Sequence, residues 1–465
     1  MDISSIYQIF LESNKVSTDS RKIKDNDLFF SLKGPNFNGN KFAEIALENG
    51  ANYAIVDEKE YAVNDNYILV DNCLDTLQKL ANHHRNKSKA KILAITGSNG
   101  KTTSKELISS VLRLQFKTIA TTGNLNNHIG VPLTLLSIEP ETEIAIIEMG
   151  ANHLKEIELL CNIADPDYGY ITNFGKAHLE GFINLKGVIK GKGELYAYLM
   201  KESRLIFINS NDNKQLEITK DYSNKFTFGN ANSNVNYSVN TINPQITISL
   251  EDVTIEDVTI KSNLFGKYNI ENLAAAICIG KYFDLSNARI KEGIENYIPN
   301  NNRSQIIEKG SNKIILDAYN ANPTSMQLAL VNFNDISEKN KIVFIGHKDD
   351  ASDLYVINID TQELTNLTND TFSDFSPAWS SSGDQIIFSS DRGASKGSPN
   401  MFDIDFSQTD LFVYDFESDK SKKIASRVES KPTWINNSYI LYSRRSKKND
   451  NGSTFFDLYK YDLNL

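Results

Sequence analysis

The segment from Ile92 to Thr103, ILAITGSNGKTT, constrains the fold of this chain more than any other stretch. An apolar run leads into two glycines and a lysine, and helix-forming residues follow, so the pattern predicts a strand, a tight loop and a helix N-terminus. Glycine lets backbone N–H groups approach an anion closely, and a helix N-terminus favours negative charge. We therefore expect a nucleotide phosphate site in which Lys101 reaches the outer phosphates and Thr102 offers its hydroxyl to Mg²⁺.

The loop departs from the full phosphate-loop pattern at one position. Ile95 stands where G-x-x-x-x-G-K-[ST] has its first glycine, which leaves the narrower pattern T-G-x-x-G-K-T-T. The plainer alternative is a glycine-rich turn between two core elements. A lysine directly after the second glycine has little purpose in such a turn, so the phosphate site is the preferred interpretation.

Length and composition limit the class of protein. The 465 residues exceed what one hydrophobic core supports, so we expect three or four domains. No run approaches the ~20 apolar residues of a membrane span, and the first residues lack the basic start of a secretory signal, which predicts a cytoplasmic protein without membrane contact. The net charge of −10 argues against non-specific nucleic-acid binding, and the three cysteines show no metal or redox spacing.

Strand-like and helix-like segments alternate through the first two thirds of the chain. Residues 1–88 predict a small α/β domain, with a short strand at 28–32. In residues 89–299 the alternation predicts a central domain with a parallel, doubly wound sheet, and ligands bind at the carboxyl ends of such strands. The phosphate loop lies in this domain, which is therefore the expected ATP-binding domain. Glu148 stands at the end of an apolar run, so we expect its carboxylate at this edge of the sheet.

The remainder of the chain changes character twice. Residues 300–346 begin a third α/β unit, with a strand at 313–316, a helix that starts at Asn322 and a strand at 341–345. Further on, short strand-like segments repeat, and the pattern Asp-Leu-aromatic recurs at Asp353, Asp410 and Asp457. Repeats of about 40 to 50 residues with short strands are typical of propeller blades, so residues 347–465 predict an all-β set of partial blades.

The motifs of the first 345 residues, taken together, resemble the Mur ligase family. The segments that carry the resemblance are Thr18–Arg21, Thr96–Thr103, Gly123–Pro132, Glu148–His153, Asn173–Gly181, Lys192–Glu194, Asn269–Asn272, Arg303 and Asp317–Met326. The last segment and the paired asparagines point to the members that add D-alanyl-D-alanine to a UDP-linked muramoyl tripeptide. Folylpolyglutamate-type ligases share the phosphate loop, but they lack a first domain with the Thr18–Arg21 motif.

The resemblance implies an ATP-dependent ligase of peptidoglycan precursor synthesis, with ATP and Mg²⁺ as cofactors. It also implies that residues 300–346 are a truncated form of the Rossmann-like third domain of the family, which stops after one strand, helix and strand. ATP would phosphorylate the C-terminal carboxylate of UDP-N-acetylmuramoyl-tripeptide, and the amine of D-alanyl-D-alanine would attack the acyl phosphate. The catalytic residues that it implies are Lys101, Glu148, His178, Lys192 and Arg303. The implied metal ligands are Thr102, Glu148, His178 and Lys192, of which Lys192 matches a carbamylated lysine of the family.

The resemblance also implies two sets of binding residues. ATP would contact Gly97, Ser98, Asn99, Gly100, Lys101, Thr102, Thr103, Asn269, Asn272, Arg303 and Asp317. In that set Asn269 and Asn272 would face the adenine. The substrates would contact Ser20, Arg21, Asn126, Asn127, Tyr319, Asn320 and Asn322, with the first two at the UDP portion.

The last quarter of the chain resembles the TolB-type propeller family instead. The resemblance rests on Ser352–Asn358, Leu367–Asp370, Ser376–Ser380 and Ile387–Gly393. Closed propellers use about four to eight blades, and this part of the chain supplies fewer, so we expect no closed circle. Three hypotheses stay open: an active ligase despite its short third domain, a binding or scaffold protein whose blades contact a protein partner, and a recombinant fusion joined at Lys341–Gly346.

Overall fold

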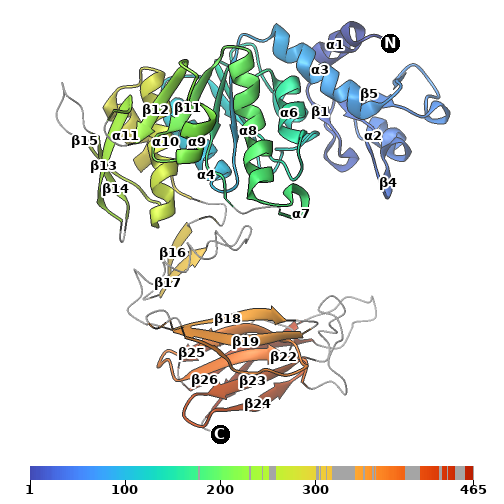
Figure 1. Ribbon diagram of the computed structural model, residues 1–465. Coiled ribbons are helices and arrows are strands. Elements are labelled where there is room, and N and C mark those ends of the chain that lie inside the picture. Colours follow the sequence, from blue (N-terminus) through green and yellow to red (C-terminus); the bar gives the residue numbers. More distant parts are fainter. Residues whose placement is uncertain are drawn as a thin grey trace. The chain divides into compact units, whose positions relative to one another are not determined.

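The computed structural model of the chain comprises two units, Met1–Ile336 and Ser337–Leu465 (Figure 1). The residues that the structure describes are 1–175, 179–229, 232–242, 245–250, 258–299, 303, 305–309, 312–316, 341–348, 351–358, 361, 363–392, 409–428, 432–436, 438–445 and 456–463. Within these ranges no helix has the length and the apolar composition needed to cross a lipid bilayer.

A four-stranded parallel sheet begins the first unit, in the order β1-β2-β5-β6. Its strands are β1 (Val16–Ser17), β2 (Asp27–Phe30), β5 (Ala51–Val56) and β6 (Tyr67–Leu69), and a small hairpin is formed by β3 (Lys33–Gly34) and β4 (Phe37–Asn38). The helices of this part are α1 (Ile3–Glu12), α2 (Ala43–Glu48) and α3 (Cys73–Lys87). The strand predicted at 28–32 is β2, which is buried throughout. The α/β class predicted for this part is confirmed.

A second sheet of nine strands follows, in the order β15-β14-β13-β12-β11-β10-β7-β9-β8. The strands are β7 (Lys91–Thr96), β8 (Thr118–Ala120), β9 (Ile144–Glu148), β10 (Tyr168–Ile171), β11 (Leu205–Asn209), β12 (Lys225–Gly229), β13 (Val235–Thr241), β14 (Thr247–Leu250) and β15 (Val258–Lys261). Neighbours from β8 to β13 run parallel, whereas β13, β14 and β15 pair antiparallel. The prediction of a wholly parallel central sheet is wrong at this edge. Residues 242–246 alone separate β13 from β14, which is too short a connection for the crossover that parallel neighbours need.

Helices pack on both faces of the central sheet, because alternate strand residues are buried on opposite faces. Ile92 and Ala94 of β7 belong to the core cluster with α6 and α8, and Leu93 and Ile95 belong to the cluster with α4 and α10. The helices are α4 (Lys101–Leu112), α5 (Gly130–Leu135), α6 (Glu156–Ala164), α7 (Leu179–Phe182), α8 (Leu185–Lys201), α9 (Asn213–Ile218), α10 (Ile270–Tyr282) and α11 (Asn287–Glu295). Since α4 and α10 share one face, the start of α10 lies beside the phosphate loop.

Helix α3 ties the first sheet to the second. Its Arg85 donates hydrogen bonds to the carbonyl of Ala164 at 3.1 Å and to the carboxylate of Asp167 at 2.8 Å. One core cluster contains residues of α1, α3, α6 and β7. The hydrophobic packing therefore continues across residue 88, where the sequence predicts a domain boundary.

His84 makes the packing of α3 sensitive to pH. Its Nε2 lies 2.8 Å from the carbonyl of Ile138 and its Nδ1 3.2 Å from the hydroxyl of Tyr7, which fits a neutral ring. Burial lowers the pKa of His84 below its ordinary value of 6.5. The unfolded chain therefore takes up this proton first as the pH falls, so the His84 contribution to the free energy of unfolding is lost below about pH 6.5.

We expect a smaller loss of stability between about pH 7 and pH 5 in His84→Gln than in the unaltered chain. Thermal unfolding at each pH measures this difference. His83→Gln is the matched control, because the side chain of His83 is partly exposed and lies one position away. Equal pH slopes in all three proteins would contradict the role given to His84.

The described residues after α11 form a hairpin in the first unit. Its strands, β16 (Gln305–Lys309) and β17 (Asn312–Leu316), pair antiparallel. Of the truncated Rossmann-like domain predicted at 300–346, the structure thus describes only this hairpin in the first unit. The helix predicted to start at Asn322 lies outside the described residues.

The second unit contains three antiparallel sheets, β18-β19-β20, β21-β22-β23-β24 and β25-β26-β27. The strands are β18 (Lys341–Lys348), β19 (Ala351–Asn358), β20 (Leu364–Asn366), β21 (Asp374–Trp379), β22 (Gln385–Ser390), β23 (Asp410–Asp415), β24 (Lys420–Ser426), β25 (Thr433–Asn436), β26 (Tyr439–Arg445) and β27 (Phe456–Asp462). Strand β18 pairs with β19 along its whole length, so it belongs to these sheets and not to a ligase domain. The all-β class is confirmed, and the assignment to propeller blades stays a prediction.

The sequence repeat of the second unit is also a repeat of contacts. Asp353 accepts the backbone N–H of Asp370 through Oδ1 at 3.2 Å, and Asp410 accepts that of Arg427 through Oδ1 at 3.1 Å. Both contacts span 17 residues. Asp353 and Asp410 thus each connect their strand to the backbone that follows the next strand.

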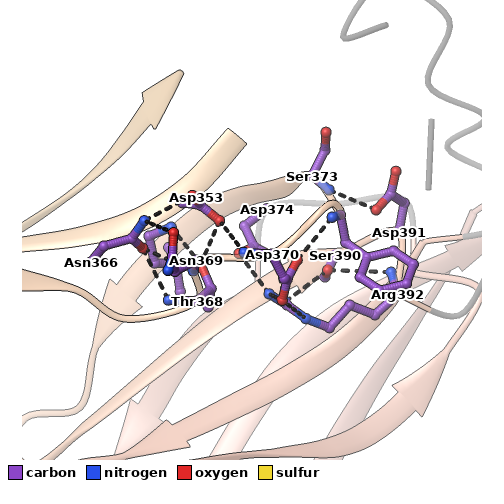
Figure 2. A network of polar contacts seen from close by, with 12 residues as sticks. Asp353, Asn366, Thr368, Asn369, Asp370, Ser373, Asp374, Ser390, Asp391 and Arg392 are labelled. Atoms are coloured by element: carbon purple, nitrogen blue, oxygen red, sulfur yellow. Dashed lines mark hydrogen bonds and ion pairs between the residues drawn. The ribbon is translucent and has the colours of Figure 1, made fainter. Parts of the chain in front are cut away.

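A polar network around Arg392 links two loops of this unit (Figure 2). The guanidinium of Arg392 donates to Asp370 Oδ2 at 2.7 Å and to Asp374 Oδ2 at 3.1 Å. The Asp374 side chain is fully buried, and burial raises its pKa to about 6. Arg392 is therefore the group that compensates a buried carboxylate.

Candidate active site

The phosphate loop joins β7 to α4 and has the predicted conformation. Gly97 has φ 141° and Gly100 has φ 79°, both in the region that favours glycine. A Cβ at Gly97 would lie 2.0 Å from Oγ1 of Thr172, and one at Gly100 would lie 2.6 Å from Oδ1 of Asn272. Both glycines are therefore required by backbone conformation and by close packing.

Residues that follow β10 hold the loop in place. Ser98 N–H donates to the carbonyl of Asn173 at 3.0 Å, and Asn99 N–H donates to its side-chain oxygen at 3.1 Å. Thr172 donates its hydroxyl to the carbonyl of Asn99 at 2.6 Å. Contacts from a neighbouring strand thus fix the backbone that would surround a phosphate.

Lys101 begins α4 and folds back over the loop. Its Nζ donates to the carbonyls of Gly97 at 2.8 Å and Ser98 at 3.3 Å. Removal from water lowers the pKa of Lys101, while the negative charge of Glu148 opposes that shift. The ammonium therefore lies at the mouth of the loop with carbonyl partners that a phosphate could replace.

Glu148, the last residue of β9, is the buried carboxylate of the site. Its Oε2 accepts the hydroxyl hydrogen of Thr102 at 3.0 Å, and its Oε1 accepts from Nδ2 of Asn126 at 2.8 Å. Its backbone N–H donates to Oγ1 of Thr121 at 2.9 Å. The carboxylate has no ion-pair partner in the described part of the chain, so its charge is available to a cation.

The oxygen donors of Thr102 and Glu148 suit Mg²⁺, which binds one or two carboxylates together with substrate phosphates and water. No cluster of three or more His, Cys, Asp or Glu side chains that could hold a metal ion occurs among the described residues. The predicted ligand His178 lies outside the described residues.

Lys192 lies on α8 and is 1% exposed. Its Nζ donates to the carbonyl of Ala151 at 2.8 Å and lies 5.3 Å from the ring centre of Phe182. Burial lowers the pKa of Lys192 strongly, and the positive charge of Lys101 lowers it further. Burial and the charge of Lys101 thus both favour the neutral amine of Lys192 over its ammonium form.

Asn272 of α10 and Asn269, which directly precedes that helix, lie beside the phosphate loop and the start of α4. Asn272 donates to Oδ1 of Asn269 at 2.9 Å and accepts from the hydroxyl of Ser104 at 2.8 Å. Asn269 in turn donates to the carbonyl of Phe265 at 2.8 Å. Their predicted contact with adenine stays a prediction, and the structure adds a supporting role that the sequence pattern did not suggest.

The predicted substrate residues are distributed over several elements. Arg21 is exposed and pairs with Asp19 at 2.9 Å, which lowers the pKa of Asp19 to about 2. Ser20 is buried beside it, and Asn127 accepts the N–H of Gly130 at 2.9 Å. The positive charge of Arg303 contributes to the lowered pKa of Lys101. The predicted residues that lie outside the described ranges are Asp317, Tyr319, Asn320 and Asn322.

Sequence reasoning missed Thr121, which holds the backbone of Glu148, and it missed the contact between Asn126 and the Glu148 carboxylate. A signal was present, because Thr121 directly follows β8 as Glu148 ends β9. Polar residues at the carboxyl ends of parallel strands meet at one edge of the sheet. Applied to the edge strand as well, that rule would have found Thr121.

Family models match most of the first unit. The model for the Mur ligase middle domain matches residues 95–280, and the model for the Mur ligase family, catalytic domain, matches residues 12–85. The first match contains the phosphate loop, Glu148, Lys192 and the asparagine pair of α10. The second contains Ser20 and Arg21.

Curated relatives and solved structures agree with these models. UDP-N-acetylmuramoyl-tripeptide–D-alanyl-D-alanine ligase of Bacillus subtilis is 36% identical over 318 residues, which cover 68% of this chain and 69% of that protein. The Escherichia coli ligase of the same name is 33% identical over 320 residues, covering 68% and 70%. A crystal structure of MurF from Acinetobacter baumannii has a TM-score of 0.65 at 28% identity, covering 72% of this chain and 76% of that one.

A MurF ligase structure from Thermotoga maritima in complex with ADP superimposes with a TM-score of 0.63 at 27% identity, over 71% of this chain and 76% of that chain. The matches leave more than a quarter of this chain uncovered. Identity and coverage at this level, together with the geometry of the loop and its carboxylate, lead to one conclusion: the chain belongs to the Mur ligase family of ATP-dependent peptide ligases.

Proposed function

We propose that this chain joins D-alanyl-D-alanine to UDP-N-acetylmuramoyl-tripeptide with the use of ATP. The names of the relatives in Bacillus subtilis and Escherichia coli support this substrate pair. The observation that carries the proposal is the buried carboxylate of Glu148, 3.0 Å from the Thr102 hydroxyl at the start of the phosphate-loop helix. This arrangement places oxygen donors for a cation beside backbone amides that suit a phosphate.

In the proposed reaction, the γ-phosphoryl group of ATP passes to the C-terminal carboxylate of the tripeptide, which leaves ADP and an acyl phosphate. The amine of D-alanyl-D-alanine then attacks the acyl carbon, loses a proton and displaces inorganic phosphate, so that an amide bond forms. Lys101 would exchange the carbonyls of Gly97 and Ser98 for the phosphate oxygens. Its ammonium would offset the charge that spreads over those oxygens during transfer.

The proposed metal site uses residues that are already close together. Thr102 and Glu148 would hold Mg²⁺, which supplies positive charge to the phosphate oxygens when it is bound. Lys192 would react as the neutral amine with carbon dioxide and lose a proton, because the resulting carbamate carries the anionic oxygens that a protonated lysine lacks. His178 would act near the same site.

The remaining predicted contacts complete the proposal. Ser20 and Arg21 would hold the UDP portion, and Asn126 and Asn127 would contact the peptide substrate. The residues of the Asp317–Met326 segment would contact ribose and substrate.

Phosphate release tests the proposal directly. We expect the purified full chain to release inorganic phosphate and to form the amide product only when ATP, UDP-N-acetylmuramoyl-tripeptide and D-alanyl-D-alanine are all present, because the amine of the dipeptide displaces the phosphate from the acyl phosphate. Glu148→Gln keeps the shape of the side chain but removes its charge, so this variant should lose activity by about 10²-fold or more. ADP binding without phosphate release or amide product would contradict the ligase proposal for this chain.

The second unit supports an alternative function. Its core clusters contain only residues of that unit, which is the packing expected of a separately folded module. We propose, as the second candidate, that this unit binds a protein partner while the ligase part is not catalytic. The same assay separates the two, since this alternative requires that no amide product forms.

A further inference from the structure

Lys105 is a buried charge that the proposed reaction does not use. It lies on α4, one turn after Lys101, and its side chain is fully buried. Its Nζ donates to the backbone carbonyl of Thr121 at 2.5 Å and lies 2.9 Å from Oε1 of Glu106. Burying a lysine is costly, so its retention inside the fold calls for a purpose beyond filling space.

The contacts of Lys105 belong to a chain of hydrogen bonds that runs from Lys105 through Thr121 and Glu148 to Thr102 and so returns to α4. Thr121, whose carbonyl Lys105 holds, accepts the N–H of Glu148 through Oγ1 at 2.9 Å. Glu148 Oε2 accepts the hydroxyl of Thr102 at 3.0 Å, and Thr102 stands on the same helix as Lys105. Helix α4 thus contacts Glu148 in two ways. Thr102 binds the carboxylate directly, and Lys105 acts on the Glu148 backbone through Thr121.

The same chain of hydrogen bonds also holds the loop that follows Thr121. Asn126 of that loop donates Nδ2 to Oε1 of Glu148 at 2.8 Å, and its carbonyl accepts the N–H of Gly150 at 2.7 Å. Strand β8, which leads into the loop, has three residues and lies at the edge of the sheet, paired only with β9. At the end of this strand the backbone N–H of Thr121 donates to the carbonyl of Ile146 at 3.0 Å, and the Lys105 ammonium adds a second attachment by donating to the carbonyl of Thr121.

We propose that Lys105 is a positioning residue of the ligase, which holds Thr121 so that the carboxylate of Glu148 stays aligned with the Thr102 hydroxyl for Mg²⁺. This inference rests on the proposed function. Partners that orient a metal-binding carboxylate typically change metal affinity or activity by about 10- to 100-fold when they are removed.

The test compares Lys105→Met with Lys105→Arg. Methionine retains most of the length and apolar surface but removes the donor, and arginine restores a cationic donor. The first readout is the dissociation constant of a fluorescent ADP analogue, measured with and without Mg²⁺. The second is the Mg²⁺ concentration at which half of the Mg²⁺-induced change in this dissociation constant is reached. We expect the Met variant to bind the analogue without Mg²⁺ within about twofold of the unaltered chain, to need about 10- to 100-fold more Mg²⁺, and to be rescued in part by Arg.

A matched control and a second pair of variants complete the experiment. Lys201→Met changes an exposed lysine of α8 and should leave every value unchanged. If Lys105→Met does not fold, Thr121→Val and Thr121→Ser carry the test, because valine removes the hydroxyl that Glu148 N–H needs and serine keeps it. Valine should raise the Mg²⁺ requirement, and serine should not.

Two results would overturn the inference, and they are distinguishable. If the unaltered chain and the folded variants need the same Mg²⁺ concentration, Lys105 has only a structural role and the ligase proposal is untouched. If the unaltered chain shows no Mg²⁺-dependent binding of the ADP analogue, the proposed function fails and the inference fails with it.

Discussion

Lys101→Met is expected to lower ATP-dependent amide formation by about 10²- to 10³-fold, the usual effect of removing one donor that stabilises transition-state charge. The Nζ atom lies at the loop mouth, 2.8 Å from the carbonyl of Gly97, and no other lysine of the described residues donates to that loop. Amide product from UDP-N-acetylmuramoyl-tripeptide, D-alanyl-D-alanine and ATP is the measurement. Affinity for ADP should also fall, since in the proposed site the same ammonium would contact the phosphates.

Lys79→Met is the matched control for Lys101→Met. Lys79 lies on α3 and pairs with Asp75 at 2.7 Å on the surface, away from the phosphate loop. The Lys101 variant should fold, because burial already disfavours the charge of that ammonium. Unchanged amide formation in folded Lys101→Met would contradict the role of the loop in phosphoryl transfer.

Arg392→Met is expected to destabilise the second unit by about 3 to 5 kcal/mol, the usual cost of leaving a buried charge without its partner. The Asp374 side chain is fully buried, and Arg392 is its ion-pair partner in the described residues. The two tryptophans of the chain, Trp379 and Trp434, both lie in this unit. Tryptophan fluorescence during chemical denaturation therefore measures the stability of the second unit alone.

Two comparisons check the Arg392 prediction. Adding Asp374→Asn to Arg392→Met removes the uncompensated charge and should recover much of the lost stability, whereas Lys422→Met on exposed β24 should have little effect. The pKa of Asp374 is already raised to about 6 by burial, and loss of Arg392 raises it further. The folded variant then binds more protons than the unfolded chain, so its stability should increase as the pH falls from about 7 to 5. An Arg392→Met variant as stable as the unaltered chain would contradict this account.

The phosphate loop could be predicted from sequence because its signal is local. Gly97, Gly100, Lys101 and Thr102 stand within six positions of one another, and backbone conformation makes each glycine necessary. The position of Glu148 followed from the rule that parallel strands present their carboxyl ends at one edge. Both features therefore depend on short-range pattern and on one general property of α/β sheets.

The antiparallel edge of the central sheet and the attachment of β18 were harder to foresee. A run of apolar residues predicts a strand, but it does not say which neighbour the strand pairs with or in which direction. The short connection between β13 and β14 makes these two strands antiparallel, because a parallel pair needs a longer crossover. From the sequence, Lys341–Gly346 could be the last strand of the predicted 300–346 unit or the first strand of the repeats that follow, and only pairing with β19 placed it among the sheets of the second unit.

What the sequence by itself determined is the phosphate loop, the α/β class of the first unit, the all-β class of the second and the family of the ligase part. Only the tertiary structure decided that Lys105 supports Glu148 through Thr121, and that Asn272 binds Ser104 at the start of α4, a contact spanning 168 positions. The physical reason is that backbone conformation and hydrophobic periodicity act over a few residues, whereas the partner of a buried polar group is chosen by packing. A buried amine or amide must find a hydrogen-bond partner, and only the folded chain specifies which one lies within reach.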